Sequence, residues 1–198
     1  MNKIKAVIFD MNGVLINDSG PVSIRVEKEF HVPADEIWPL LKDALAQVRV
    51  PGADSRQAWK PVLDRLNISY SQFFKFWFDG ESLNQELLDH LKTLKAIGLK
   101  IIVLSNNFPE RTNNYRHLYP ELFEEIDQQY FSWETGYVKP DPKSFTQIIE
   151  NHDFSPGEYL YFDDNEGNLK AATNLGIISH KFAGLTDTKS FLAQSISK

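Results

Sequence analysis

The sequence predicts an α/β protein in which a parallel sheet carries helices on both faces, with an all-helical domain inserted after the first strand. In the second half of the chain, short apolar runs alternate with helical segments of ten or more residues. From about Asn17 to Gly80 the pattern is instead helical, and it contains no convincing strand. A chain of 198 residues is long enough for one substantial core and a small second domain.

The first expected element is a buried strand over residues 4–9, which ends at Asp10. The dipeptide Asn12-Gly13 that follows is a strong signal for a β-hairpin. A hairpin would need a partner strand directly after the turn, and helical segments occupy that position. We therefore expect the turn to lead into a crossover connection.

The inserted domain is expected to contain four helices, separated by Pro and Gly residues that commonly end helices. These helices are expected at 22–30, 34–48, 55–66 and 71–78. The aromatic residues between 73 and 78 are expected to form part of their core. Five cationic side chains there could contact a ligand, although most are expected to be solvated: Arg25, Arg49, Arg56, Lys60 and Arg65.

The remaining elements are expected to form a Rossmann-like core from residues 1–16 and 82–198, which leaves 17–81 as the helical domain. Ser82 and Gln85 form a capping box, so a helix is expected to begin at Ser82 and to end near Gly98. The strands that follow are expected at 100–104, 129–131, 159–162 and 177–180.

The composition of the chain argues against several classes of function. The formal net charge of −6 argues against a protein that binds the nucleic-acid backbone. The chain has no cysteine, which excludes disulfides and thiolate chemistry. The first apolar run is too short for a signal peptide, and no run has membrane-spanning length. We expect a cytoplasmic protein with no nucleic-acid or membrane partner; the sequence carries no signal of its oligomeric state.

Polar side chains follow the ends of the predicted strands. In an open parallel sheet the carboxyl ends of the strands lie at one edge, which is where ligands bind. Three carboxylates, a hydroxyl, an amide and a lysine are expected to converge there: Asp10, Ser105, Asn106, Lys139, Asp163 and Asp164. Neighbouring carboxylates repel one another unless a cation joins them, and Mg²⁺ is the cation that prefers oxygen ligands.

Four short motifs in this order resemble those of the haloacid dehalogenase-like hydrolases, a family with a helical cap inserted between its first and second motifs. The motifs are the stretches 9–15, 104–106, 139–142 and 161–168. The resemblance covers the α/β core. It implies an enzyme that hydrolyses a small phosphorylated substrate with the help of Mg²⁺.

The resemblance also implies a role for each carboxylate. Asp10 would be the nucleophile that forms an aspartyl-phosphate intermediate. Mg²⁺ would be held by Asp10, by the backbone carbonyl of Asn12 and by Asp164. Asp163 would bind the ion either directly or through water.

The other motif residues would bind the phosphoryl group. Ser105 and the backbone N–H of Asn106 would hold phosphoryl oxygens, and Lys139 would neutralise charge on the nucleophile and the phosphate. Asn168 would orient the aspartate pair, although a role as a turn or cap residue is an equal alternative.

Asn12 departs from the pattern. Most phosphatases of the family carry a second Asp at this position, which protonates the leaving group and then deprotonates the attacking water. An amide can do neither, and the loss of a general acid–base typically costs ~10²–10⁴ in rate. Asn12 therefore occupies a catalytic position, and the presence of Asn there instead of Asp predicts slow turnover.

Alternatives to an ordinary phosphatase stay open. Asn12 could be an engineered substitution. The protein could be a 2-haloacid dehalogenase, whose reaction needs no leaving-group protonation and no metal. It could also be a pseudoenzyme that binds a phosphorylated metabolite or a partner protein. We rank a slow phosphatase first because the chain keeps the Asp163-Asp164 pair that a metal requires.

Overall fold

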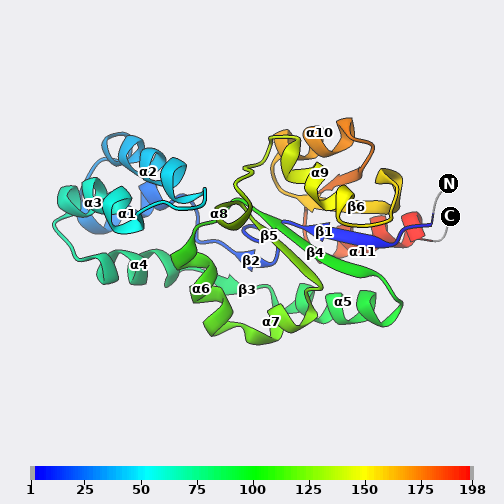
Figure 1. The fold of residues 1–198 in the computed structure, drawn as a ribbon. Coiled ribbons are helices and arrows are strands. Elements are labelled where there is room, and N and C mark those ends of the chain that lie inside the picture. The colour runs from blue at the N-terminus through cyan, green and yellow to red at the C-terminus, as the bar shows by residue number, and fades with distance from the viewer. Residues whose placement is uncertain (1–2, 197–198) are drawn as a thin grey trace.

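Five parallel strands form the central sheet of the computed structural model, which describes residues 3–196 (Figure 1). Their order across the sheet is β5-β4-β1-β6-β7, and every neighbouring pair is parallel. The bounds are β1 Ala6–Phe9, β4 Lys100–Ser105, β5 Gln128–Phe131, β6 Tyr159–Asp163 and β7 Ile178–Lys181. The predicted parallel α/β sheet is confirmed.

The strand β1 lies at the centre, between β4 and β6. Phe9 is in register with Val103 on one side and with Phe162 on the other. The chain fills the β4 side of the sheet first and then crosses to the β6 side, so the strand order reverses beside β1. This is the switch point at which open α/β sheets bind ligands, and Asp10 is the first residue beyond β1.

Helices cover both faces of the sheet (Figure 1). Alternate residues of β1 enter different cores: Val7 and Phe9 pack with the first set of helices, Ala6 and Ile8 with the second. The first set is α5 Gln85–Ala96, α6 Pro109–Leu118, α7 Pro120–Glu125 and α11 Leu185–Ile196. The second set is α9 Lys143–Glu150 and α10 Glu166–Asn174.

Two short helical elements lie between these: α8 Ser132–Thr135 follows β5, and the 3₁₀ helix η1 Pro156–Glu158 precedes β6. No helix among residues 3–196 combines the length and the apolar composition needed to cross a membrane.

Residues 22–78 form a helical block at one end of the sheet (Figure 1). Its helices are α1 Val22–Phe30, α2 Ala34–Val48, α3 Ser55–Leu66 and α4 Tyr70–Phe78. Three of them have the predicted bounds, and the fourth begins one residue earlier because Ser69 caps it. The block has its own buried cluster around Trp59 and Phe73, as expected for the aromatic residues.

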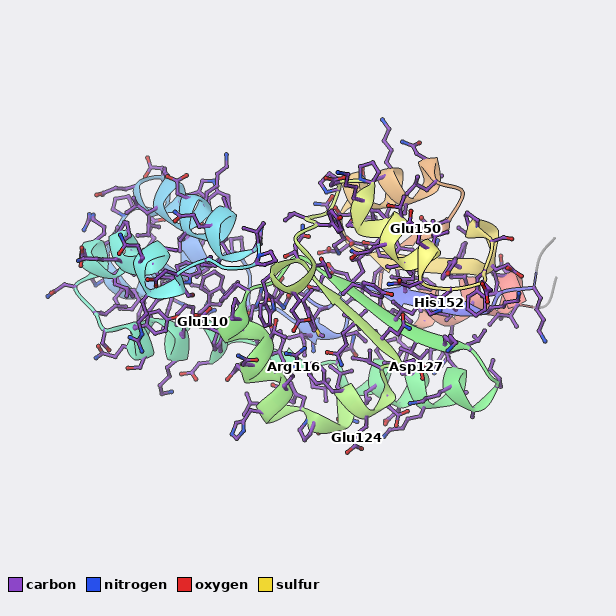
Figure 2. All side chains as sticks on the ribbon, in the orientation of Figure 1. Glu110, Arg116, Glu124, Asp127, Glu150 and His152 are labelled. Atoms are coloured by element: carbon purple, nitrogen blue, oxygen red, sulfur yellow. The ribbon has the colours of Figure 1, made fainter. Side chains whose placement is uncertain are left out.

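The α/β core contributes one ring to that cluster. Phe108, which precedes α6, is 1% exposed, and its ring centroid lies 5.3 Å from that of Trp77. Glu110, at the start of α6, lies at the same junction (Figure 2) and accepts hydrogen bonds from the hydroxyls of Ser55 and Tyr70. The block is therefore attached to α6 by both apolar and polar contacts.

The two chain segments that join the block to the core lie side by side. Strand β2, Ile16–Asn17, pairs with the antiparallel strand β3, Ser82–Leu83. The expectation of no strand from about Asn17 to Gly80 is therefore wrong at Asn17, the second residue of β2. Two-residue strands are too short to show a periodic pattern, and only the return of the chain creates the pairing.

The predicted capping box at Ser82 is also wrong. Ser82 is extended in β3, and α5 begins at Gln85 with Asn84 as its cap. The Oδ1 atom of Asn84 accepts a hydrogen bond from the Leu87 N–H at 3.2 Å, and its Nδ2 atom donates to the Val14 carbonyl at 3.0 Å. Asn84 thus caps the helix and also holds the loop that leads out of β1.

Candidate active site

The carboxyl ends of the strands surround a cavity of about 250 Å³. It is lined by most of the predicted site residues, together with two arginines and one further asparagine: Asp10, Asn12, Arg49, Ser105, Asn106, Arg111, Lys139, Asp164, Asn165 and Asn168. Asp163 lies fully buried beside the cavity. The structure therefore brings together all the residues that the motifs indicated.

Lys139 is the centre of the buried ionic network. Its Nζ atom lies 2.9 Å from Oδ1 of Asp10 and 2.7 Å from Oδ2 of Asp163. Lys139 is 4% exposed, and a buried ammonium group requires such partners. It compensates the charges of Asp10, which follows β1, and Asp163, which ends β6.

The Asn106 side chain positions Lys139. Its Oδ1 atom accepts a hydrogen bond from the Lys139 N–H at 2.7 Å, and its Nδ2 atom donates to the Lys139 carbonyl at 2.8 Å. The resemblance assigned a role only to the backbone N–H of Asn106. The hydrogen bonds from its side chain to the Lys139 backbone give Asn106 an additional role, which was not predicted from its place at the end of a strand. Ser105, which is 2% exposed, precedes Asn106 and faces the same cavity.

Asp163 is surrounded by donors. Oδ1 accepts from the Asn165 N–H at 2.8 Å, and Oδ2 accepts from Lys139 and from the Tyr161 hydroxyl. The Asn168 amide donates to Oδ1 at 3.2 Å and to Oδ2 at 3.0 Å. With both oxygens engaged, Asp163 is suited to position Lys139 and has little capacity left for a metal ion.

Asp10 is a destabilised carboxylate. Burial raises its pKa to about 6, and the nearby Asp163 contributes to the rise, although Lys139 and the Met11 N–H act in the opposite direction. The Met11 N–H donates to Oδ1 of Asp10 at 2.7 Å. Ionisation of such a buried carboxylate is costly, and it becomes favourable when a further cation binds beside the carboxylate.

The residues present fit a hard metal ion. One carboxylate oxygen each from Asp10, Asp163 and Asp164 lie within 4.8 Å of one another, and an all-oxygen donor set is the kind that Mg²⁺ prefers. Gly13 allows Asp164 to approach: a Cβ atom at Gly13 would lie 2.7 Å from Oδ2 of Asp164. Asp10 and Asp164 are the two acids with capacity left for a metal.

Asn12 belongs to a second buried network. Its Nδ2 atom donates to the Tyr115 hydroxyl at 2.6 Å, and that hydroxyl donates to Oε2 of Glu81 at 2.6 Å. Arg111 forms an ion pair with the other oxygen of Glu81. Sequence reasoning missed these three residues because α6 and the segment before β3 carry no motif.

Comparison with known proteins identifies the family. The family profile for haloacid dehalogenase-like hydrolases matches residues 4–176 of the chain. The chain belongs to this family. The resemblance inferred from the four motifs is therefore confirmed, and this HAD-like hydrolase has the fold expected of it.

Several curated relatives are much longer than this HAD-like hydrolase. It is 29% identical to mouse acyl-CoA dehydrogenase family member 10, over 87% of this chain and 17% of the relative. It is 22% identical to mouse bifunctional epoxide hydrolase 2, over 89% of this chain and 36% of the relative. The phosphorylated carbohydrates phosphatase of Thermotoga maritima is similar in size: 26% identity covers 88% of this chain and 82% of that protein.

Solved structures share the fold of this HAD-like hydrolase. A HAD family enzyme from Bacteroides thetaiotaomicron superposes with a TM-score of 0.84 at 23% identity, covering 96% of this chain and 99% of that one. The same enzyme has been solved as a magnesium complex. The L-2-haloacid dehalogenase of Xanthobacter autotrophicus superposes with a TM-score of 0.65 at 22% identity, covering 92% of this chain and 78% of that one.

Proposed function

We propose that this HAD-like hydrolase is a Mg²⁺-dependent phosphatase that acts on a small phosphorylated metabolite through an aspartyl-phosphate at Asp10. The observation that carries the proposal is the buried Asp10–Lys139–Asp163 network beside Asp164, on a cavity of about 250 Å³. Support also comes from the phosphatase relative in Thermotoga maritima and from the magnesium complex of the Bacteroides enzyme.

In the proposed reaction the Asp10 carboxylate attacks phosphorus, and the bond from phosphorus to the leaving oxygen breaks. The Ser105 hydroxyl and the Asn106 N–H would hold phosphoryl oxygens, and Lys139 would stabilise the charge that develops on them. The metal, held by Asp10, Asp164 and the Asn12 carbonyl, would supply further charge neutralisation.

The second half of the reaction regenerates the enzyme. Water attacks phosphorus, the bond from phosphorus to Asp10 breaks, and inorganic phosphate leaves. Asn12 cannot donate or accept the protons of these steps, so the leaving oxygen takes its proton from water, and the attacking water releases its proton to solvent. We therefore propose that turnover is slow for alkyl phosphates, whose leaving oxygens are strongly basic.

We further propose that residues 17–81 act as a cap over this site and help to select the substrate. The paired strands β2 and β3 form the only two-stranded link among the described residues between the block and the core. Arg49, from the end of α2, lines the same cavity as Asp10. A cap that contributes a side chain to the cavity can discriminate between leaving groups.

One observation favours dehalogenation as a second candidate. Asn12 cannot protonate a leaving group, and release of a halide does not require protonation. The acidic cluster argues in the other direction, because a halide displacement gives Asp164 no metal to bind. We therefore place the phosphatase first.

The test is a panel of assays on the purified chain. With p-nitrophenyl phosphate, we expect activity that depends on Mg²⁺ and is abolished by EDTA and by Asp10→Asn. Absence of phosphate release with aryl, acyl and alkyl phosphates would contradict the proposal and favour a pseudoenzyme. Release of chloride from 2-chloropropionate in the presence of EDTA would favour the dehalogenase.

A further inference from the structure

Arg49 is a cation with no counterion in the part of the chain that the structure describes. It follows α2 directly and lines the cavity that contains Asp10. Among residues 3–196 no carboxylate lies within ion-pair distance of its guanidinium group, and its Nε atom is buried without a hydrogen-bond partner. Burial lowers the pKa of Arg49, as does the charge of Arg111, whereas Asp10 acts in the opposite direction. A desolvated charge of this kind favours binding of an anion.

The loop after α2 lies against the core. A Cβ atom on Gly136, the residue after α8, would lie 3.6 Å from Cδ of Pro51. Figure 1 shows this loop extending from the helical block toward α8. The close approach of Pro51 to the core places Arg49 on the wall that the helical block contributes to the cavity, which is a different wall from the strand ends that carry Asp10.

The second arginine of the cavity differs from Arg49. Arg111 forms an ion pair with Glu81, whose side chain is only 3% exposed. Its charge is therefore compensated within the protein. Among the described residues, only Arg111 of these two arginines has a carboxylate within ion-pair distance, so Arg49 is the guanidinium left to pair with an anion of the ligand.

We propose that Arg49 binds a second anionic group, a carboxylate or a phosphate, carried by the leaving-group part of the substrate. The inference rests on the proposed phosphatase function and names its substrate class: phosphate monoesters that bear another negative charge. The transferring phosphoryl group would be bound at the strand ends by Ser105 and Lys139. Arg49 approaches from the helical block, where the remainder of the substrate would project. A guanidinium pairs well with either anion because its N–H groups form a planar fork.

The experiment compares substrates that differ by one anionic group. The first pair is glycerol 3-phosphate and 3-phosphoglycerate, which tests a carboxylate. The second pair is fructose 6-phosphate and fructose 1,6-bisphosphate, which tests a phosphate. In the unmodified protein we expect kcat/KM to be at least about tenfold higher for the doubly anionic member of one pair. The pair that shows the preference identifies the anion as a carboxylate or a phosphate.

Arg49→Gln should reduce that preference to about twofold or less, mainly by raising KM for the doubly anionic member, and Arg49→Lys should restore part of it. Arg56→Gln is the matched control: Arg56 is an exposed arginine of the same block that stacks on Tyr70, and it does not line the cavity. It should keep the full preference.

The proposal is overturned if neither pair shows a preference, or if Arg49→Gln lowers kcat/KM equally for both members, which would place Arg49 on the transferring phosphoryl group. Absence of metal-dependent phosphate release from aryl, acyl and alkyl phosphates alike would instead refute the proposed function. In that case the role of Arg49 is tested by calorimetry, which measures the affinities of the protein for 3-phosphoglycerate and glycerol 3-phosphate in the presence of Mg²⁺. Equal affinities for the unmodified protein and Arg49→Gln would overturn the assignment.

Discussion

The side chain of Asn12 donates a hydrogen bond to the hydroxyl of Tyr115, with 2.6 Å between Nδ2 and the oxygen. The same hydroxyl donates to Glu81, the residue that precedes β3. The position expected to carry a general acid is thus connected through Tyr115 to the segment by which the helical block joins the core. Tyr115 is fully buried, and burial raises its pKa well above the usual value, so this hydroxyl stays protonated.

This arrangement predicts that Asn12→Asp raises the turnover of alkyl phosphates by at least about tenfold. The new carboxylate would accept a hydrogen bond from Tyr115 and would share that single proton with Glu81. Repulsion between two acids at one hydroxyl raises the pKa of one of them, which favours a proton donor near neutral pH. The measurement is kcat for glycerol 3-phosphate, with p-nitrophenyl phosphate as the control, since its leaving group needs little protonation. An unchanged glycerol phosphate rate would contradict this explanation of Asn12.

The sheet and its strand-end residues could be predicted because each is encoded locally. An apolar run followed by a carboxylate indicates both β1 and Asp10, and the same pattern gives β6 and Asp163. Parallel topology then brings these residues to one edge. Lys139 was predicted differently, from a proline-containing loop before α9 that matches the third motif of the family.

The network around Asn12 could not be predicted for a physical reason. Tyr115 and Arg111 lie on α6, which has only a weak amphipathic pattern, and they meet Glu81 only because the chain returns from the helical block beside β2. The cap of α5 was misassigned to Ser82 for the same reason: the pairing of β3 with β2 keeps Ser82 extended. Tertiary contacts of this kind leave no trace in a local pattern.

Removal of the lysine should destabilise the fold. Lys139→Met would leave Asp10 and Asp163 buried without their common counterion, and breaking a buried ion pair in this way costs ~3–5 kcal/mol. Urea unfolding in EDTA at neutral pH measures the loss. The matched control is Lys143→Met, an exposed lysine at the start of α9, which should change the unfolding free energy by less than about 0.5 kcal/mol. Equal effects of the two substitutions would mean that Lys139 does not compensate the buried acids.

A methyl group at Gly13 should weaken metal binding. In Gly13→Ala the Cβ atom would lie 2.7 Å from Oδ2 of Asp164, so the carboxylate must move. Displacement of a ligand is expected to lower Mg²⁺ affinity by about tenfold or more, measured by calorimetry. Gly52→Ala is the control, because Gly52 has φ +79°, close to the +82° of Gly13. A Cβ atom there would meet no described atom within 4 Å apart from those of its chain neighbours. This variant should share the backbone cost of ~1 kcal/mol without a change in metal affinity. Equal Mg²⁺ affinities in the two variants would exclude Asp164 as a ligand.

The raised pKa of Asp10 predicts a pH-dependent stability in the metal-free protein. Because its value of about 6 in the fold exceeds the ordinary 3.8, the folded state binds more protons between these values, and the stability that protonated Asp10 contributes is lost as pH rises through about 6. From about pH 5 to pH 7.5 the unfolding free energy should fall by on the order of 1–2 kcal/mol more for the unmodified protein than for Asp10→Asn. Urea unfolding in EDTA at the two pH values gives this difference.

Mg²⁺ should reverse the loss of stability at the higher pH, because the metal favours the ionised carboxylate of Asp10. The ion should bind progressively more weakly below pH 6. Identical pH dependence of the two proteins in EDTA would show that Asp10 is ionised without cost in the fold, and the electrostatic basis for a metal beside it would then be absent.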